Sequence, residues 1–250
     1  MELKQKAFPL LTIFLLLPGQ ITAKSADELL RTTRQYVAGW IDTLPDLVCR
    51  QSTNQFASYY RHNWQLGDWL VAEVAVENKV EHYSLLTRNG EPVARPKEVA
   101  DTLGSQGEFL SAVRVLFDPA SKAEFKSRGI DRKNGSPLHR FDFMVRQKNS
   151  QWSVGPGSGY TPAYFGSIWV DEHNGAIHRL DMEAQNFPDK SYVRATSLRL
   201  MFSPVDIEGA SYVLPTAATV ILCTNRLYCE RRNLTFSDYH RFTVTTRILP

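Results

Sequence analysis

The sequence has little net charge and no basic block. Its 250 residues carry 29 lysines and arginines against 26 aspartates and glutamates, a formal net charge of +3 at pH 7. Proteins that bind nucleic acid concentrate basic residues on one surface, so this balance gives no support to that class of function. Hydrophobic residues make up 43% of the chain, which is enough to build a core and excludes a disordered protein.

The sequence signatures of common catalytic and metal sites are also missing. The stretch GPGSGYTPAYFG (155–166) has neither the spacing nor the Lys-Ser/Thr ending of a phosphate-binding loop. No nucleophile elbow and no zinc-ligand spacing occur in the chain. We therefore expect no metal ion, no cofactor and no catalytic residue, and the sequence favours a protein that is not an enzyme.

Long apolar runs are absent after the start of the chain. Two lysines precede an apolar run from Ala7 to Leu17, which is too short to cross a bilayer comfortably, and the small residue Ala23 follows it. This is the pattern of a secretory signal peptide. We predict a signal peptide over residues 1–23, a single β-rich domain over 24–250, and export to the periplasm or the medium. An uncleaved membrane anchor is the alternative.

Cysteines are few. Export permits disulfides, and Cys223 and Cys229 flank five residues with turn-forming character. We predict that these two cysteines face each other across a hairpin and form a disulfide. A zinc-binding pair is the alternative, although no second ligand pair has zinc spacing. Cys49 is left over, and we expect it to be a buried small hydrophobic residue, as most free cysteines are.

Hydrophobic periodicity predicts helices and strands in a mixed order. Ser25 and Glu28 form a capping box, and apolar residues then recur at helical spacing until Pro45. The same spacing predicts a second helix over 106–117. Alternating apolar and polar residues predict strands at 69–77, 80–87, 138–146, 192–202, 211–215, 217–223 and 233–248. The order predicts an α+β fold with one large antiparallel sheet.

The stretch 164–184 concentrates histidines and carboxylates, and its Asn-Gly dipeptide is a strong hairpin signal. With an even-numbered loop, period-two alternation places Trp169 and Asp171 on the same face as His178 and Leu180. A metal site needs three or four converging ligands, and here at most two converge. We therefore interpret Asp171 and His178 as a structural pair, with a catalytic dyad as the alternative.

The same hairpin resembles a known family. The matching residues are Ile168-Trp169-Val170-Asp171, the turn Asn174-Gly175, and Ile177, Arg179 and Leu180, which resemble the hairpin of periplasmic lipoprotein carrier proteins, the outer-membrane lipoprotein-sorting family. The stretches LPDLVCRQ (44–51) and GEFLSAVRVLFDPAS (107–121) are similar to secreted bacterial proteins of unassigned function. The resemblance implies a curved, half-open antiparallel barrel with an N-terminal helix and a middle helix packed on its concave side.

A half-barrel closed by helices leaves a cavity suited to apolar ligands. We therefore predict an exported, non-enzymatic binding protein that holds a lipid, an acyl chain or another apolar molecule, and the resemblance implies a carrier whose partner is a lipid or a lipoprotein. An aromatic residue on a strand is more often a core residue than a ligand contact. With that alternative open, the predicted lining residues are Trp69, Phe141, Phe143, Trp152, Tyr160, Tyr164, Phe165, Trp169 and Leu180.

Two other functions are alternatives. The first is a cell-envelope interaction or sensing module that uses an exposed sheet edge or the loop 155–165. The second is a hydrolase of unknown substrate that uses Asp171 and His178 with a nucleophile from elsewhere in the chain, such as Cys49.

Overall fold

The computed structural model describes residues 24–59, 63–93, 108–132, 137–155, 159–224 and 228–241. The predicted signal peptide, 1–23, lies outside the described residues. The helices are α1 (Ala26–Thr43) and α3 (Ser111–Phe117), with two short 3-10 turns, η2 (Pro119–Ser121) and η3 (Gln147–Asn149). The strands are β1 (Leu47–Tyr59), β2 (Gln65–Glu77), β3 (Val80–Arg88), β4 (Glu91–Pro92), β5 (Glu124–Asp131), β6 (Leu138–Val145), β7 (Tyr164–Val170), β8 (Ile177–Ala184), β9 (Ala195–Ile207), β10 (Ala210–Cys223) and β11 (Tyr228–Arg241).

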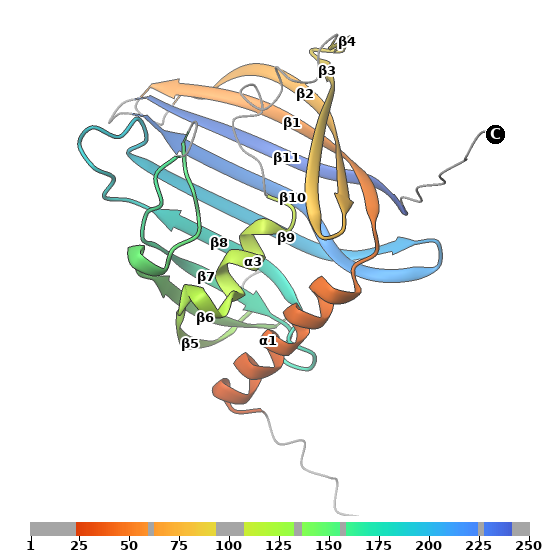
Figure 1. Cartoon of the computed structure of the whole chain (residues 1–250), viewed down its shortest axis with the longest axis vertical. Coiled ribbons are helices and arrows are strands. Elements are labelled where there is room, and N and C mark those ends of the chain that lie inside the picture. Colours follow the sequence, from red (N-terminus) through yellow and green to blue (C-terminus); the bar gives the residue numbers. More distant parts are fainter. Residues whose placement is uncertain are drawn as a thin grey trace, which may run out of the picture.

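These strands form one antiparallel sheet in the order β4-β3-β2-β1-β11-β10-β9-β8-β7-β6-β5. Two blocks of sequential hairpins, β1–β4 and β5–β11, meet where β1 pairs with β11, so the first and last strands lie side by side (Figure 1). Within the described residues β4 and β5 are unpaired edges, so the sheet stays open. The predicted α+β fold with one large, half-open antiparallel sheet is confirmed.

One face of the sheet carries the core. Apolar side chains from β1, β2 and β6–β11 form a single buried cluster with residues of α1 and α3. Both helices lie on the same side of the sheet, which we call the inner face (Figure 1). The opposite, outer face carries most of the exposed arginines and carboxylates of the long strands. This one-sided burial explains the alternating pattern that the sequence showed. None of the helices in the described part of the chain is long and apolar enough to span a membrane.

The N-terminal helix begins and ends where the sequence predicts. Ser25 caps α1, because its side chain accepts a hydrogen bond from the Glu28 backbone N–H at 3.2 Å. The helix ends at Thr43, two residues before Pro45, which disfavours helical backbone just ahead of it. Its buried residues, Leu29, Thr33 and Val37, lie on the face toward the sheet.

The middle helix is shorter than predicted, because α3 begins only at Ser111. A side chain from another strand caps it. The Glu81 carboxylate of β3 accepts hydrogen bonds from the backbone N–H groups of Leu110 and Ser111, at 2.8 and 2.7 Å. At the far end, Tyr164 on the inner face donates a hydrogen bond to the Val115 carbonyl at 3.1 Å. The sheet therefore holds α3 by polar contacts at both ends.

The β7–β8 hairpin is confirmed, but its predicted faces are wrong. Trp169 pairs with Arg179, whereas the next residue, Val170, pairs with Ile177. His178 is therefore an extra residue on β8, a β-bulge. A shift of one residue moves every following side chain to the other face of a strand. Trp169 thus shares the outer face with Arg179 instead of a face with His178.

The turn between these strands packs against α1. Asp171 Oδ1 accepts hydrogen bonds from the backbone N–H groups of His173 and Asn174, at 2.8 and 3.0 Å, which shapes the turn. Gly175 has a φ of 75°, and a Cβ at this position would lie 2.8 Å from the backbone nitrogen of Thr33. The glycine therefore allows a close approach of the helix as well as a tight turn.

A pair of glycine substitutions measures this docking contact. Gly90 occupies a second Asn-Gly turn with a φ of 87°, but a Cβ there would meet nothing within 4 Å. Gly90→Ala should cost about 1 kcal/mol of unfolding free energy from backbone strain alone. Gly175→Ala adds the clash with α1, so we expect it to cost roughly 2–4 kcal/mol. Urea unfolding of both variants measures the difference, and equal losses would refute the contact.

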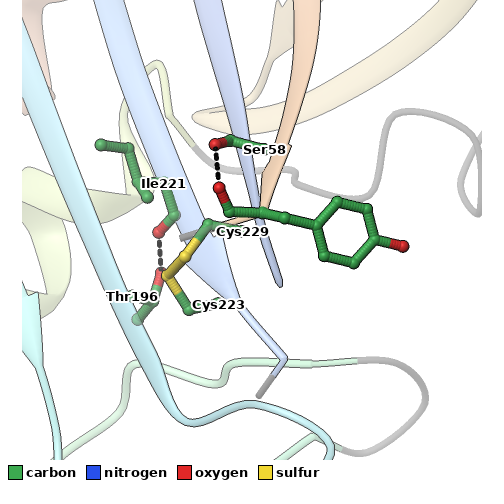
Figure 2. Close-up of a disulfide and its surroundings, with 6 residues drawn as sticks. Ser58, Thr196, Ile221, Cys223 and Cys229 are labelled. Atoms are coloured by element: carbon green, nitrogen blue, oxygen red, sulfur yellow. Dashed lines mark hydrogen bonds between the residues drawn. A yellow bond between two sulfur atoms is a disulfide. The ribbon is translucent and has the colours of Figure 1, made fainter. Parts of the chain in front are cut away.

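The predicted disulfide between Cys223 and Cys229 is confirmed. It joins paired residues of β10 and β11, next to Ser58 of β1 and to Thr196 of β9, whose hydroxyl donates to the Ile221 carbonyl at 3.1 Å (Figure 2). The bond therefore fixes one end of the central strands. Cys49 is a free, buried cysteine, as predicted, and burial raises the pKa of its thiol to about 12.

The double variant Cys223→Ser/Cys229→Ser tests what this bond contributes. The bond closes a short loop, for which chain entropy predicts a loss of about 2 kcal/mol of unfolding free energy. Urea unfolding measures the loss. As a control, alkylation of the unfolded wild type without reductant should label Cys49 alone. Labelling of all three cysteines under those conditions would contradict the bond.

Candidate functional site

Four of the nine predicted lining residues lie together on the inner face. Phe141 and Phe143 of β6, Tyr164 of β7 and Leu180 of β8 are all buried in the core cluster. The ring of Phe143 packs edge-on against that of Tyr164, with centroids 6.3 Å apart. Burial raises the pKa of the Tyr164 hydroxyl, which stays protonated and donates to α3. These residues form the floor beneath the middle helix.

Two further predicted residues flank this floor. Trp152 packs edge-on against Tyr164, with ring centroids 5.6 Å apart. Tyr160 packs against Phe187 at 5.5 Å and accepts a hydrogen bond from Gln147. Both are half-buried at the margin of the core cluster. Part of the loop that contains Tyr160, residues 156–158, lies outside the described residues.

The remaining three predicted residues do not join the others. Trp69 and Phe165 are exposed, at 46% and 42%. Trp69 alternates with the buried Leu70, and Phe165 alternates with the buried Tyr164, so both point to the outer face. Trp169 is also on the outer face, because of the β-bulge.

Trp169 is the centre of a charged ladder on the outer face. The guanidinium groups of Arg179 and Arg140 lie 4.2 and 5.3 Å from its ring, and its Nε1 donates to Asp131 at 2.9 Å. Arg179 forms an ion pair with Asp181 at 2.5 Å, and Arg140 forms one with Asp142 at 2.8 Å. Cation–π contacts and the neighbouring ion pairs thus cover the Trp169 ring on the outer face. The ladder is a structural network.

Hydrogen bonds hold one carboxylate of this ladder, that of Asp142, in its ionised form. Burial alone would raise the pKa of Asp142, but hydrogen bonds from Ser167, Arg128 and Arg140 outweigh burial and lower it. The residues that the hydrolase hypothesis needs are not assembled. No hydrogen bond joins Asp171 to His178 among the described residues, and three strands separate β8 from Cys49 on β1. The described part of the chain also holds no group of three metal-ligating side chains.

A small apolar pocket lies where α1 and α3 meet the inner face, and we call it the helix pocket. It is lined by Tyr36, Val37 and Trp40 of α1, Val113 of α3, and Ile177, Phe202 and Val213 of the sheet. The space inside is about 10 Å³, room for about one water molecule. The two helices therefore leave little space at this point of the inner face. The sequence placed the α1 residues on an apolar face but did not single them out as a site.

Polar side chains interrupt the inner face where β1 meets β11, and we call them the interior polar cluster. Its members are Gln51 and Thr53 of β1, Glu230 and Arg232 of β11, and Glu108, which precedes α3. Gln51, Thr53 and Glu108 are buried, and Arg232 pairs with Glu230 at 3.1 Å with 11% of its side chain exposed. Sequence reasoning missed this cluster, because glutamine, threonine and arginine on a strand resemble an exposed face.

Burial controls the charge of Glu108. Desolvation disfavours its ionised form and raises its pKa to about 7, reinforced by the carboxylate of Glu81 and opposed by the guanidinium of Arg232. Its Oε2 and the Oε1 of Gln51 are buried and have no hydrogen-bond partner among the described residues. Each such atom costs roughly 1–3 kcal/mol of folding free energy, so the cluster lowers the stability of the interior.

A second concavity lies beside the disulfide. It has a volume of about 210 Å³ and is lined by Trp64, Glu183, Gln185, Ala195, Thr196, Ser197, Ile221 and Cys223. Trp64 is held there by Arg231, whose guanidinium lies between the rings of Trp64 and Phe56, at 4.6 and 4.5 Å. The sequence did not indicate this groove, because Trp64 is distant from its neighbours along the chain.

An open antiparallel sheet with helices on its inner face defines the class of fold that the hairpin resemblance implied. Solved structures similar to this chain include a DUF1329 family protein from Desulfovibrio piger (10% identity, 86% of this chain and 94% of that chain covered, TM-score 0.41). Others are a LolA superfamily protein from Nitrosomonas europaea (10%, 89% and 96%, 0.33) and an outer membrane lipoprotein-sorting protein domain from Vibrio parahaemolyticus (11%, 85% and 90%, 0.37). The names of the second and third structures are those of the group that the hairpin resembles, and the likeness is one of fold alone. No protein-family model and no curated protein matches the chain.

The raised pKa of Glu108 predicts a pH dependence of stability. The native state holds a proton that the unfolded chain, with a pKa of about 4, releases. Stability is therefore fully present below about pH 4 and is lost as the pH rises through about 7, by up to about 3 kcal/mol. Glu108→Gln removes this loss, so it should be about 2–3 kcal/mol more stable than the wild type at about pH 8 and nearly equal to it at about pH 5.

Urea unfolding at the two pH values checks this expectation. Glu183→Gln is the control, because Glu183 is an exposed carboxyl at the end of β8 and its loss leaves Glu108 in place. An advantage of Glu108→Gln that is the same at both pH values would contradict an uncharged, buried Glu108.

Proposed function

We propose that this protein is an exported binding protein that takes up a lipid, an acyl chain or another apolar molecule between its helices and the inner face of its sheet. The observation that carries the proposal is the helix pocket. Its walls are apolar and aromatic, and they come from α1, α3 and three strands of the sheet. Ligand sites in proteins are of this kind, with apolar walls contributed by separate elements.

The pocket has to widen to accept a ligand, because its present space is about 10 Å³. α1 is the element that can move. It contributes Thr33 Oγ1 and Trp40 Nε1 to the interior, and both are buried with no hydrogen-bond partner among the described residues. Displacing the helix returns these groups to water and recovers roughly 1–3 kcal/mol for each. That gain offsets part of the cost of separating α1 from the sheet.

Phe202 of β9 stands at the centre of this interface. It meets Trp40 edge-on, with ring centroids 6.3 Å apart, and it lines the pocket together with Ile177. The buried Phe141, Phe143, Tyr164 and Leu180 continue the apolar inner face under α3. An acyl chain that replaces α1 would therefore meet a continuous apolar surface. A carrier role, with a lipid or lipoprotein delivered across the periplasm, is the finer form of this proposal.

Export belongs to the same proposal. The signal peptide predicted over 1–23, ahead of a single β-rich domain predicted over 24–250, supports export to the periplasm or the medium, and a disulfide is compatible with those compartments. A soluble protein with an enclosed apolar site suits the transfer of apolar molecules through an aqueous compartment.

The neutral apolar dye 1-N-phenylnaphthylamine tests the site. We expect its fluorescence to rise on binding the purified protein. Trp40→Ala removes one wall of the helix pocket and should weaken dye binding by roughly tenfold, from lost aromatic contact. Trp69→Ala removes an exposed tryptophan of the outer face and should leave binding unchanged. No dye binding at all, or equal losses in the two variants, would refute the proposed function.

A further inference from the structure

The interior polar cluster lies on the same inner face as the proposed ligand site. On β11, Arg232 alternates with the buried Leu234 and Phe236, so all three point to the inner face. Gln51 pairs directly with Phe236. Phe109 packs edge-on against that same ring, with centroids 5.6 Å apart.

Glu108 reaches this part of the sheet through its neighbour in the chain. Phe109 is fully buried against Phe236, and Glu108 precedes it and is itself 3% exposed. Electrostatic contacts of the Glu108 carboxyl with Arg232 and Glu81 agree with this position. The segment that leads into α3 therefore brings a carboxyl over the β1–β11 junction.

The cluster holds more hydrogen-bonding capacity than the protein uses. Among the described residues, the only hydrogen bond of the Arg232 guanidinium goes to Glu230, although this group has five N–H donors. Gln51 donates to Thr53 at 3.2 Å, but its Oε1 is buried and unpaired, as is Glu108 Oε2. Buried polar groups in proteins are almost always paired. The unpaired atoms of Gln51 and Glu108 therefore need an explanation, and a polar partner that enters from outside the protein supplies one.

The charges select the kind of polar group. Arg232 is permanently charged, and the side chain of its ion-pair partner Glu230 is 34% exposed, so solvent weakens the attraction between the two charges. The guanidinium fork matches carboxylate and phosphate oxygens in two-pronged geometry. Glu108 in its protonated form supplies an O–H donor beside it.

Resting on the proposed function, we propose that the interior polar cluster binds the anionic head group of a single-chain lipid, with the Arg232 guanidinium pairing with the head group beside the Glu108 carboxyl. The acyl chain then runs along the apolar inner face toward the helix pocket. The shared chemistry is an oxyanion on an alkyl chain, as in a fatty acid or a lysophospholipid.

The neighbours of Glu108 allow this arrangement to respond to pH. The charged groups around it are Glu81 on β3 and Arg232 and Glu230 on β11. Cys49 and Tyr239, which lie on the same part of the inner face, have pKa values raised by burial and stay uncharged near neutral pH. Ionisation of Glu108 therefore places a second carboxylate against an anionic head group, and the ligand should bind more weakly as the pH rises through about 7.

Competition against bound 1-N-phenylnaphthylamine tests the inference with the purified protein. Laurate, lauroyl-lysophosphatidylglycerol and 1-dodecanol present the same apolar chain length with a carboxylate, a phosphate or a neutral hydroxyl. We expect at least one of the two anions to displace the dye at about tenfold lower concentration than dodecanol. The stronger of the two identifies the source of the head group as a free fatty acid or a phospholipid.

Variants locate the effect. Arg232→Gln/Glu230→Gln removes the ion pair without leaving a lone buried charge, and it should abolish the preference for the anion while dodecanol competes as before. Arg199→Gln is the matched control, because it removes a similar ion pair, with Asp181, from the outer face. Glu108→Gln should keep the preference and lose its decline between about pH 6 and about pH 8.

The outcomes separate the two proposals. If the dye itself does not bind, the proposed function fails and this inference fails with it. If the dye binds and the anions and dodecanol displace it equally, or if the double variant keeps the full preference for the anion, the apolar site stands and the head-group site is overturned.

Discussion

An open antiparallel sheet has two faces, and everything else in this protein depends on how one of them is kept from water. Apolar side chains from eight strands gather on the inner face, and α1, α3, the segment before α3 and loop residues such as Val154 and Phe187 pack with them among the described residues. The sheet cannot cover itself because β4 and β5 do not pair within the described residues. The helices therefore fill part of the half-barrel, and apolar burial is the force that holds them there.

Polar contacts decide where the helices sit. Glu81 caps the start of α3, and Tyr164 donates a hydrogen bond near its end. The Asn-Gly turn before β8 packs closely against α1 because Gly175 has no side chain. These contacts are directional and few, whereas the apolar contacts are many and unspecific. The same interior holds unpaired polar atoms on α1 and in the interior polar cluster. In the function proposed above, these unpaired atoms lower the cost of displacing a helix from the sheet.

The outer face is held together by other interactions than the inner face. Its arginines and aspartates neutralise one another around Trp169, and a disulfide joins β10 to β11 at one end. These links stiffen the sheet without contributing to the inner face. In the function proposed above, the sheet is the fixed wall of the site, and the cost of opening the site falls on the helices.

Local patterns in the sequence determined the capped N-terminal helix, most of the strands, the β7–β8 turn and the Cys223–Cys229 pairing, because each depends on residues near one another in the chain. They did not predict β1 and β5. Alternation also predicted the inner position of Phe141 and Phe143 on β6. Alternation could not predict which side chains of β7 and β8 share a face. The bulged residue His178 moves every following side chain of β8 to the opposite face. The helix pocket and the interior polar cluster were decided only by tertiary structure. Their residues come from helices and strands far apart in sequence, and only the pairing of β1 with β11 and the docking of both helices bring them together.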